Sequence, residues 1–307
     1  MPELPEVETL RGDAERHLLG RRVVAATLHA PEVVKLPEPT AFCAQLTGGA
    51  FVAARRRAKY LFLDLDNGRG WALQLALFGQ FLLCDPPAGT DRAAGASTAA
   101  LDPDTLLVAT LADGAVLHVL DRSRYTRLYL GTPDEISEAL HLDALGPEPL
   151  DPAFTADALA ALLAGRRGRL KALLLDQHAV AGLGNIYVDE ALWRARLHPG
   201  RTAGSLTASE VGALHEAIQT VLSEAVANRG TTFHTYRDLM GAKGLHQDHL
   251  AVFHRQGEPC PHCGAPIRRI TLASRDTHLC ATCQAPEQVQ EQPPAKAHGR
   301  RGAGRGG

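Results

Sequence analysis

The first twenty residues carry a helical pattern. Their apolar positions recur three or four residues apart, at Val7, Leu10, Ala14 and Leu18. Pro5 fits the first turn of a helix, and Glu6 and Glu8 lie near its positive end. Gly20 follows the last apolar position, where a glycine commonly ends a helix. The pattern predicts an amphipathic helix that begins almost at the chain terminus.

Between Arg22 and about Leu130 the pattern changes to short apolar runs separated by turns. The runs that predict strands are residues 23–25, 51–53, 60–65, 71–75 and 106–108. Asp66-Asn67-Gly68 and Asp113-Gly114 predict hairpin turns, because glycine accepts the positive φ that such turns require. Many short strands without intervening helices predict a β-sandwich. Residues 86–100, rich in Gly, Pro, Ala and Thr, predict a mobile loop within it.

Beyond Pro152 the apolar pattern is helical again. Leucine stripes span residues 159–163 and 170–174, and a longer apolar stripe runs from Val211 to Ala225. Thr207 and Glu210 form a capping box before the longer stripe. Residues 134–152, between the two patterned regions, are acidic and contain prolines, which predicts a linker between domains.

A glycine-rich turn, Gly182-Leu183-Gly184-Asn185, lies between two of the predicted helices. Asn185 can cap the helix that follows over residues 186–196. Backbone N–H groups at such a turn and helix start also form a natural phosphate site. Asn185 therefore has two interpretations, as a phosphate ligand and as a helix cap.

Composition limits the class of protein. A chain of 307 residues is long enough for two domains and a small satellite. Hydrophobic content of 45% and charged content of 21% are typical of a soluble globular protein. No apolar run approaches the roughly 20 residues of a membrane span, and the acidic N-terminus does not resemble a signal peptide. We therefore expect a cytoplasmic protein without a membrane partner.

The charge is unevenly distributed. A formal net charge of −2 argues against a protein that is basic throughout. Cationic residues nevertheless gather in four groups, at residues 55–59, 122–127, 166–171 and 268–275. A duplex carries one negative charge per about 1.7 Å of axis, so a few cations on one face suffice to bind it. We expect about half of these residues to be solvated surface, and Lys171 of the third group is a DNA-binding candidate.

Four of the six cysteines form a C-x2-C-x16-C-x2-C pattern, made by Cys260, Cys263, Cys280 and Cys283. This spacing predicts one structural zinc ion, because each pair offers two sulfurs to a tetrahedral site that has no open position. Residues 267–272 and 278–279 predict a β-hairpin between the pairs. Beyond Gln284 the chain has no apolar period, which predicts a disordered tail.

The opening residues Met1-Pro2-Glu3 contain groups that can take part in a reaction. A small second residue such as proline usually permits removal of the initiator methionine, which leaves a secondary amine as the terminus. An α-amine has a pKa of about 7.7–8.0, against about 10.4 for lysine, so part of it is neutral at pH 7. A neutral amine can attack an electrophilic carbon and form an iminium, with Glu3 moving the protons. The alternative is a capped helix whose terminus frays.

Three motifs together carry a family resemblance. PELPEVET at residues 2–9, GNIY at residues 184–187 and the four-cysteine ribbon resemble the formamidopyrimidine-DNA glycosylases, relatives of endonuclease VIII. The resemblance covers nearly the whole chain up to Gln284. The sequence LGPEPL at residues 145–150 also matches a motif of the family. The opening has the PELPE form rather than the PEGPE form of the endonuclease VIII branch.

The resemblance implies an α+β multidomain fold. An antiparallel β-sandwich flanked by the N-terminal helix is followed by a helical helix-two-turn-helix domain and a zinc-ribbon β-hairpin. The expected boundaries are residues 1–133 for the catalytic sandwich, 134–152 for the linker, 153–250 for the helical domain, 251–284 for the zinc ribbon and 285–307 for the tail.

The resemblance also implies roles for individual residues. Pro2 is the nucleophile on the damaged nucleotide's sugar, Glu3 is its acid/base partner, and Lys59 contacts the damaged nucleotide. Asn185 holds the DNA backbone, and Arg275 at the hairpin tip touches phosphate near the flipped nucleotide.

Other DNA-contacting positions depart from the family. Arg124 aligns with an arginine that grips phosphate next to the lesion, but Gln74 replaces a histidine and is a weaker, uncharged contact. Relatives fill the gap left by the flipped nucleotide with a methionine, an arginine and a phenylalanine. Leu77, Ser123 and Tyr125 stand at those places, and a serine cannot reach the orphaned base as an arginine does.

The function implied is a bifunctional DNA glycosylase and abasic-site lyase of base excision repair. It would excise oxidised purines such as 8-oxoguanine and formamidopyrimidines from damaged double-stranded DNA, as a monomer associated with a bacterial nucleoid. The alternatives are an endonuclease VIII-like enzyme for oxidised pyrimidines and a catalytically weak damage-binding paralogue. Residues 231–245 resemble the segment that caps the lesion in the family, although their sequence diverges from it.

Overall fold

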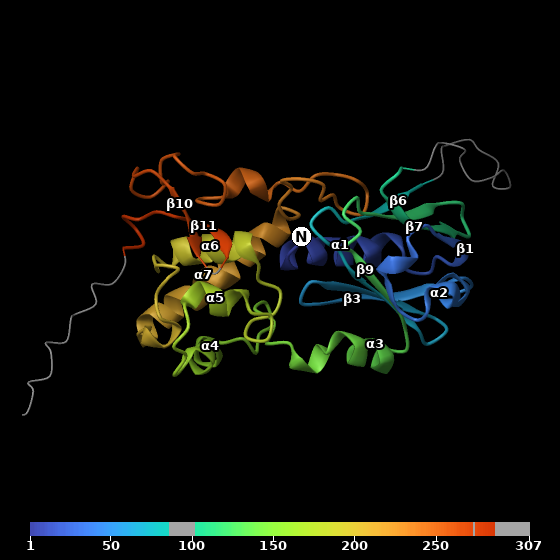
Figure 1. Cartoon of the computed structure of the whole chain (residues 1–307), viewed down its shortest axis with the longest axis horizontal. Coiled ribbons are helices and arrows are strands. Elements are labelled where there is room, and N and C mark those ends of the chain that lie inside the picture. Colours follow the sequence, from blue (N-terminus) through green and yellow to red (C-terminus); the bar gives the residue numbers. More distant parts are fainter. Residues whose placement is uncertain (86–101, 273, 286–307) are drawn as a thin grey trace, which may run out of the picture.

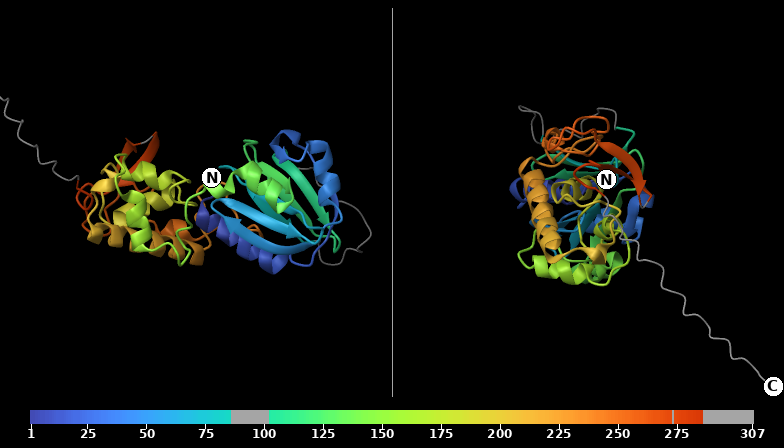
Figure 2. Two further views of the ribbon diagram at one scale, coloured as in Figure 1. Left: turned by 90° about the horizontal axis from the view of Figure 1, so that it is seen from below. Right: turned by 90° about the vertical axis from the view of Figure 1, so that its left-hand side faces the viewer.

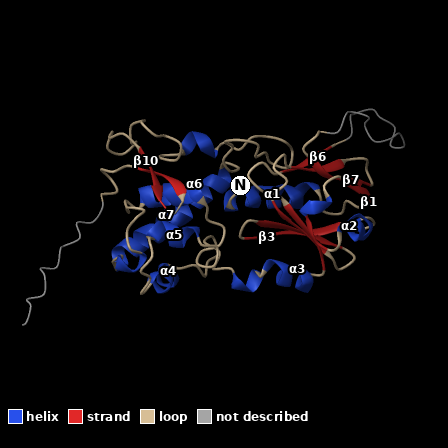
Figure 3. Cartoon of the chain, in the orientation of Figure 1, coloured by secondary structure: helices blue, strands red, loops and turns tan. Residues whose placement is uncertain are grey.

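The structure is a computed structural model that describes residues 1–85, 102–272 and 274–285. The predicted mobile loop at residues 86–100 and the predicted tail beyond residue 285 lie outside these residues. Strands gather in one half of the molecule and most helices in the other (Figure 3). The N-terminal helix α1 (Leu4–His17) lies where the two halves meet (Figure 1).

Two facing sheets form the N-terminal half. One has the order β1-β7-β8-β6, made of β1 (Val23–Leu28), β7 (Thr105–Leu111), β8 (Val116–Leu120) and β6 (Gln80–Cys84). The other has the order β2-β9-β5-β4-β3, made of β2 (Val34–Leu36), β9 (Arg127–Gly131), β5 (Gly70–Gln74), β4 (Tyr60–Leu65) and β3 (Phe51–Arg57). All these neighbours pair antiparallel except β2 and β9, which are parallel. These two strands are far apart in sequence, so no hairpin dictates their direction.

The core of the sandwich lies between the sheets and under two helices. Buried side chains alternate along β7 and β8, as strands with one covered face require. Trp71 is fully buried, and its ring meets those of Phe42 and Phe81 edge-on. Phe42 belongs to helix α2 (Pro39–Leu46), which the apolar pattern did not reveal. Helix α1 covers β3 and β4.

The expected linker contains a helix. Helix α3 (Pro133–Leu140) begins with a capping box between Thr132 and Glu135, and a short 3₁₀ turn η2 (Leu142–Ala144) follows. Ile136 and Leu140 pack on Tyr129 of the five-stranded sheet. Residues 133–144 are therefore attached to the sandwich, and the connection between the halves begins only after them.

Among the described residues, the second half has four α-helices: α4 (Ala156–Leu163), α5 (Leu170–Leu175), α6 (Asn185–Arg194) and α7 (Ala208–Ala227). The predicted capping box is present at the start of α7, where Glu210 N donates to Thr207 Oγ1 and Thr207 N donates to a Glu210 carboxylate oxygen. Further 3₁₀ turns are η1 (Pro31–Val33), η3 (Ala203–Ser205) and η4 (His246–His249). The helices share a leucine-rich core.

Two segments tie the halves together (Figure 2). Helix α1 contributes Leu4 to the helical core and Val7 and Leu10 to the sandwich core. After α7 the chain returns to the sandwich, where Tyr236 and Leu239 join its core. Both halves therefore contribute to any site at the beginning of α1.

A two-stranded hairpin, β10 (Arg268–Leu272) and β11 (Arg275–Leu279), lies beside α6. The strands pair antiparallel with Leu272 opposite Arg275, as the sequence predicted for the segment between the cysteine pairs. Within the described ranges, no helix is long and apolar enough to cross a membrane.

Candidate active site

The glycine-rich turn before α6 receives the beginning of α1. Gly182 adopts a left-handed φ of 88°, and its carbonyl accepts a hydrogen bond from Leu4 N at 3.1 Å. A Cβ on Gly184 would lie 2.2 Å from the carboxyl carbon of Glu3. Glycine at position 184 is therefore required for the Glu3 carboxylate to occupy its place.

Glu3 is held in a nearly closed environment, with a residue exposure of 5%. Its Oε1 accepts a hydrogen bond from Ile186 N at 3.1 Å, while its buried Oε2 has no partner among the described residues. Burial raises the pKa of Glu3 from 4.5 to about 7, Glu6 reinforces the rise, and Lys59 opposes it. Glu3 can therefore donate or accept a proton near neutral pH.

Glu6 organises the segments around Glu3. Its carboxylate accepts hydrogen bonds from Glu3 N at 2.7 Å, from Thr231 N at 2.8 Å and from the Tyr187 hydroxyl. These partners belong to the chain terminus, α6 and the returning segment. The motif PELPE suggested Glu6 only as a helix-start residue, and its role in joining three segments depends on residues far along the chain.

Lys59 lies in the tight turn between β3 and β4 and is buried to 9% exposure. Burial lowers the pKa of its ammonium, and the carboxylates of Glu3 and Glu6 oppose this change. The preceding Ala58 has a left-handed φ of 51°, and its N–H donates to Glu148. The turn is thus fastened to the segment that leads into the helical domain.

A cleft of about 720 Å³ opens at the junction of the halves. Six of the predicted site residues line it: Pro2, Glu3, Lys59, Leu77, Asn185 and Arg275. Pro2, Glu3 and Glu6, which we call the N-terminal wall, are all buried. Residues from the returning segment also line the cleft, from Thr231 to Tyr236 except Thr232. These sequence-distant groups converge in a concave site large enough for a nucleotide.

Asn185 faces the cleft from the start of α6 and does not cap the helix. The N-cap is Gly184, and Asn185 Nδ2 donates to the Asp276 carbonyl at 2.9 Å. Its Oδ1 is buried without a partner in the described structure. This bond ties α6 to the hairpin that carries Arg275, whose side chain is exposed in the cleft.

The predicted gap-filling residues stand at the edge of the cleft. Leu77, Ser123 and Tyr125, which we call the wedge tip, lie on two neighbouring loops, and of the three only Leu77 belongs to the cleft lining. Leu77 is 49% and Tyr125 73% exposed. Ser123 Oγ donates a hydrogen bond to Asp121 Oδ1 at 2.6 Å, and this bond fixes the orientation of the serine side chain. Outside the lining, Arg124 pairs with Glu32 at 2.9 Å, and Gln74 is half-buried at the end of β5.

Lys171 requires a correction. It is completely buried, and its ammonium contacts Asp189 at 2.6 Å, Thr277 Oγ1 at 2.8 Å and the Asp276 carbonyl at 3.1 Å. Direct contact between Lys171 and DNA is not available in this arrangement. The partner Asp189 also accepts a hydrogen bond from His278 N at 2.8 Å. Lys171 therefore fastens the hairpin to α6.

Most of the basic side chains at residues 55–59 form ion pairs or hydrogen bonds within the protein. Arg56 pairs with Glu8 at 3.0 Å and with Glu148 at 2.6 Å. Arg57 pairs with Glu148 at 3.1 Å and donates to two nearby carbonyls. These contacts join α1, the β3–β4 turn and the interdomain connection, so they position Lys59 rather than present a basic surface.

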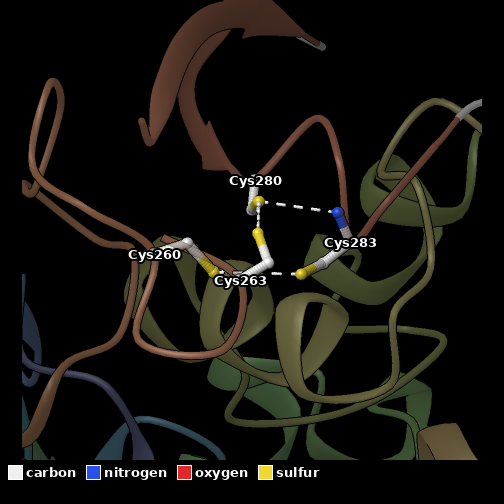
Figure 4. Close-up of side chains that lie close together, drawn as sticks. All are labelled: Cys260, Cys263, Cys280 and Cys283. Carbon is white, nitrogen blue, oxygen red and sulfur yellow. Dashed lines mark hydrogen bonds between the residues drawn. The ribbon is translucent and has the colours of Figure 1, made fainter. Parts of the chain in front are cut away.

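The four cysteine side chains converge at the end of the hairpin (Figure 4). Their sulfurs lie within 4.8 Å of one another, with 3.8 Å between Cys260 and Cys283 and 3.4 Å between Cys263 and Cys280. A tetrahedral zinc ion with bonds of about 2.3 Å holds its sulfurs about 3.8 Å apart. The cluster fits such an ion, while a disulfide needs about 2.0 Å.

Three parts of the chain match known domain families. Residues 1–128 match the formamidopyrimidine-DNA glycosylase N-terminal domain, residues 145–237 its H2TH domain, and residues 257–286 a zinc finger found in FPG and IleRS. The third match and the sulfur geometry confirm the prediction of one structural zinc ion.

Whole-chain relatives agree with these matches. Formamidopyrimidine-DNA glycosylases from Symbiobacterium thermophilum and Herpetosiphon aurantiacus are 44% and 43% identical, covering 98% and 93% of this chain and 95% and 100% of theirs.

Solved structures show the same fold. The MutM (Fpg) protein of Thermus thermophilus has a TM-score of 0.79 at 37% identity, covering 92% of this chain and 98% of that one. A complex between the Lactococcus lactis Fpg and an abasic-site-containing DNA has a TM-score of 0.81 at 30% identity, covering 92% and 100%. With all three domain families in order and relatives matched over nearly their full length, the chain belongs to the formamidopyrimidine-DNA glycosylase family.

Proposed function

We propose that this protein is a bifunctional DNA glycosylase and abasic-site lyase of base excision repair that removes oxidised purines from duplex DNA. One observation carries the proposal. The beginning of the chain, a buried acid with a pKa near 7 and a buried lysine share one cleft with Asn185 and Arg275. The names of the relatives and the DNA complexes of the Lactococcus lactis Fpg support the same substrate class.

The nucleophile is the amine of Pro2 after removal of Met1. Burial lowers the pKa of the Met1 amine in this structure, with Glu3 opposing the change. A terminus within the same wall is therefore favoured in its neutral, nucleophilic form. The target nucleotide rotates out of the stack, which its damaged pairing makes easier. The amine nitrogen then bonds to C1′, and the base leaves with the electron pair of the glycosidic bond and takes up the proton that the attacking nitrogen loses.

Glu3 completes the first stage and permits the second. Its carboxylic acid gives a proton to O4′ as the C1′–O4′ bond opens, and the lone pair of the deprotonated nitrogen forms the C1′=N bond of the iminium. The iminium acidifies the proton on C2′. Its removal expels the 3′ phosphate by β-elimination, and a second elimination expels the 5′ phosphate and leaves a gap. Lys59, Asn185 and Arg275 are placed to hold the strand during these steps.

Borohydride trapping on lesion-containing duplex tests the nucleophile. The processed protein should give a covalent complex, which should be lost with Met1 retained or in Pro2→Gly, while DNA binding persists. Undiminished trapping with Met1 shown by mass spectrometry to be present would move the nucleophile to another amine, first of all Lys59. Excision on a panel of oxidised purines and pyrimidines tests the substrate class, and preference for pyrimidines would favour the endonuclease VIII-like alternative.

A further inference from the structure

His254 occupies an unusual place on the cleft wall. It lines the same cleft as Pro2, Glu3 and Arg275, although no local sequence pattern singles it out. Its backbone is left-handed, with a φ of 59°. That conformation suits glycine and is unfavourable for a residue with a Cβ. A left-handed non-glycine residue beside a reactive cleft points to a function of its side chain.

The imidazole ring is supported from one side. Its centroid lies 4.6 Å from that of Phe253, with 8° between the planes, and 4.6 Å from that of Phe233. The two phenylalanine centroids are 5.5 Å apart, well short of the separation that opposite faces of the imidazole would require. His278 lies 5.5 Å away, and its centroid is 4.9 Å from that of Phe253. The other side of His254 is therefore open, and the residue is exposed.

The nitrogen atoms of this ring are available for a ligand. Neither makes a hydrogen bond to any described residue, so the ring is oriented by stacking alone. The charged and titratable groups around it are mostly basic: His278, His234 and Arg269, with Asp276 as the acid. Asp276 is itself paired with Arg269 at 2.8 Å. Burial and the three basic neighbours lower the pKa of His254, and Asp276 opposes them. An anion placed there would favour the charged imidazole.

We infer that His254 binds a backbone phosphate of the DNA strand, on the cleft wall that carries Arg275. A phosphodiester satisfies the free N–H edge and the basic surroundings together. A neutral purine stacked on the open ring face would gain nothing from those charges. The inference rests on the proposed function, because it takes DNA as the ligand. With a phosphate bound, the charged imidazole of His254 adds a cationic contact in a protein in which Gln74 supplies an uncharged one.

The chain offers a matched control. His141 also has a left-handed backbone, with a φ of 49°, and is exposed at the end of α3, away from the cleft. His141→Gly and His254→Gly both remove an exposed histidine and both relieve an unfavourable backbone. Only the second removes a group from the cleft. His254→Asn is a second variant, because asparagine tolerates a left-handed backbone and keeps a neutral donor.

The experiment measures equilibrium binding, at pH 6 and several salt concentrations, to a duplex with a tetrahydrofuran abasic analogue. His254→Gly should weaken binding about tenfold, the lower end for a hydrogen bond to a charged group. It should also reduce the slope of log affinity against log salt by about 0.9. His254→Asn should lose the same slope with a smaller loss of affinity. His141→Gly should match the natural protein, and the thermal midpoints should show that all variants fold.

Two results would overturn the inference. Unchanged affinity and salt slope in His254→Gly would leave His254 without a phosphate. A loss seen with an oxidised purine in the duplex, but absent with the abasic analogue, would mean that the ring stacks on the extruded base. Borohydride trapping of the natural protein on the same duplexes carrying a lesion separates the proposals. Trapping without a His254 effect rejects this inference alone, whereas no trapping rejects the proposed chemistry.

Discussion

The N-terminal wall and the wedge tip differ in how firmly the protein holds them. Pro2, Glu3 and Glu6 are buried. The carboxylate of Glu6 accepts hydrogen bonds from three separate segments of the chain. Leu77 and Tyr125 project with 49% and 73% exposure. The difference indicates that the reacting groups are positioned before DNA arrives, while the groups that meet the duplex gain most of their contacts from it. Preorganised groups need no rearrangement at the moment of reaction.

The largest expected effect comes from disturbing the wall without changing a reacting group. Gly184→Ala introduces a Cβ 2.2 Å from the Glu3 carboxyl carbon, so the carboxylate must move. A displacement of about 1 Å costs roughly 100-fold in rate, and we expect at least that loss of excision. Binding to abasic-analogue DNA should stay within a few-fold. Gly212→Ala, whose Cβ meets nothing within 4 Å, is the control and should leave excision unchanged.

A second test measures how much the buried Glu3 of the N-terminal wall lowers the free energy of unfolding. Burial raises the pKa of Glu3 to about 7 in the folded protein. Proton binding to Glu3 therefore adds to the free energy of unfolding, fully below about pH 4.5, and this contribution is lost as the pH rises through 7. Glu3→Gln carries no charge at any pH. Denaturant unfolding should show the variant more stable than the natural protein at pH 8, by up to about 3 kcal/mol, with a smaller difference at pH 5. An equal difference at both values would mean that Glu3 does not titrate in this range.

Removing zinc should separate DNA binding from global stability. A structural zinc ion contributes its folding energy locally. Cys260→Ser or chelation should therefore weaken lesion binding about tenfold, the worth of one charged contact, through displacement of Arg275. The main thermal transition should persist. Collapse of the whole protein would show that the Lys171–Asp189 ion pair makes the hairpin an integral part of the helical half.

The smallest effect concerns the wedge tip. Ser123 is held by Asp121, and the guanidinium of neighbouring Arg122 lies 3.8 Å over the ring of Phe78. Both side chains are thus held by contacts within the protein. A bidentate base contact is worth about 1–3 kcal/mol, and without it we expect excision of 8-oxoguanine opposite cytosine to stay within about tenfold of the other bases.

Single-turnover excision opposite each of the four bases measures this preference, and Ser123→Arg should strengthen it. Strong cytosine preference that survives in Ser123→Arg and disappears in Arg122→Ala would assign the contact to Arg122.

Local signals were sufficient for much of the fold. The predicted strands at residues 51–53, 60–65 and 71–75 lie within or nearly within β3, β4 and β5, and the Thr207–Glu210 box begins α7. Turn glycines Gly68 and Gly114 have the expected positive φ. Alternation, capping and turn chemistry act over a few residues, so sequence displays them directly.

The unpredicted features depend on distant partners. Lys171 looked like one of several surface cations because its partners Asp189 and Thr277 lie 18 and 106 positions away. Helix α3 did carry a readable signal, the Thr132–Glu135 capping box with Pro133 inside it, but an acidic and proline-bearing composition favoured a linker. The stacking that orients His254 had no local signal at all.

The division of α1 between two cores has a consequence for the order of events during synthesis. Glu6 leaves the ribosome 225 positions before Thr231, one of its hydrogen-bond partners. At about 5–20 residues per second, that interval lasts roughly 10 to 50 seconds. During this time the first residues cannot reach their final surroundings and stay within reach of other enzymes. Met1 itself is 46% exposed in the folded protein, but Pro2 is buried. The bond that a methionine aminopeptidase must cleave is therefore most accessible before the last third of the chain folds.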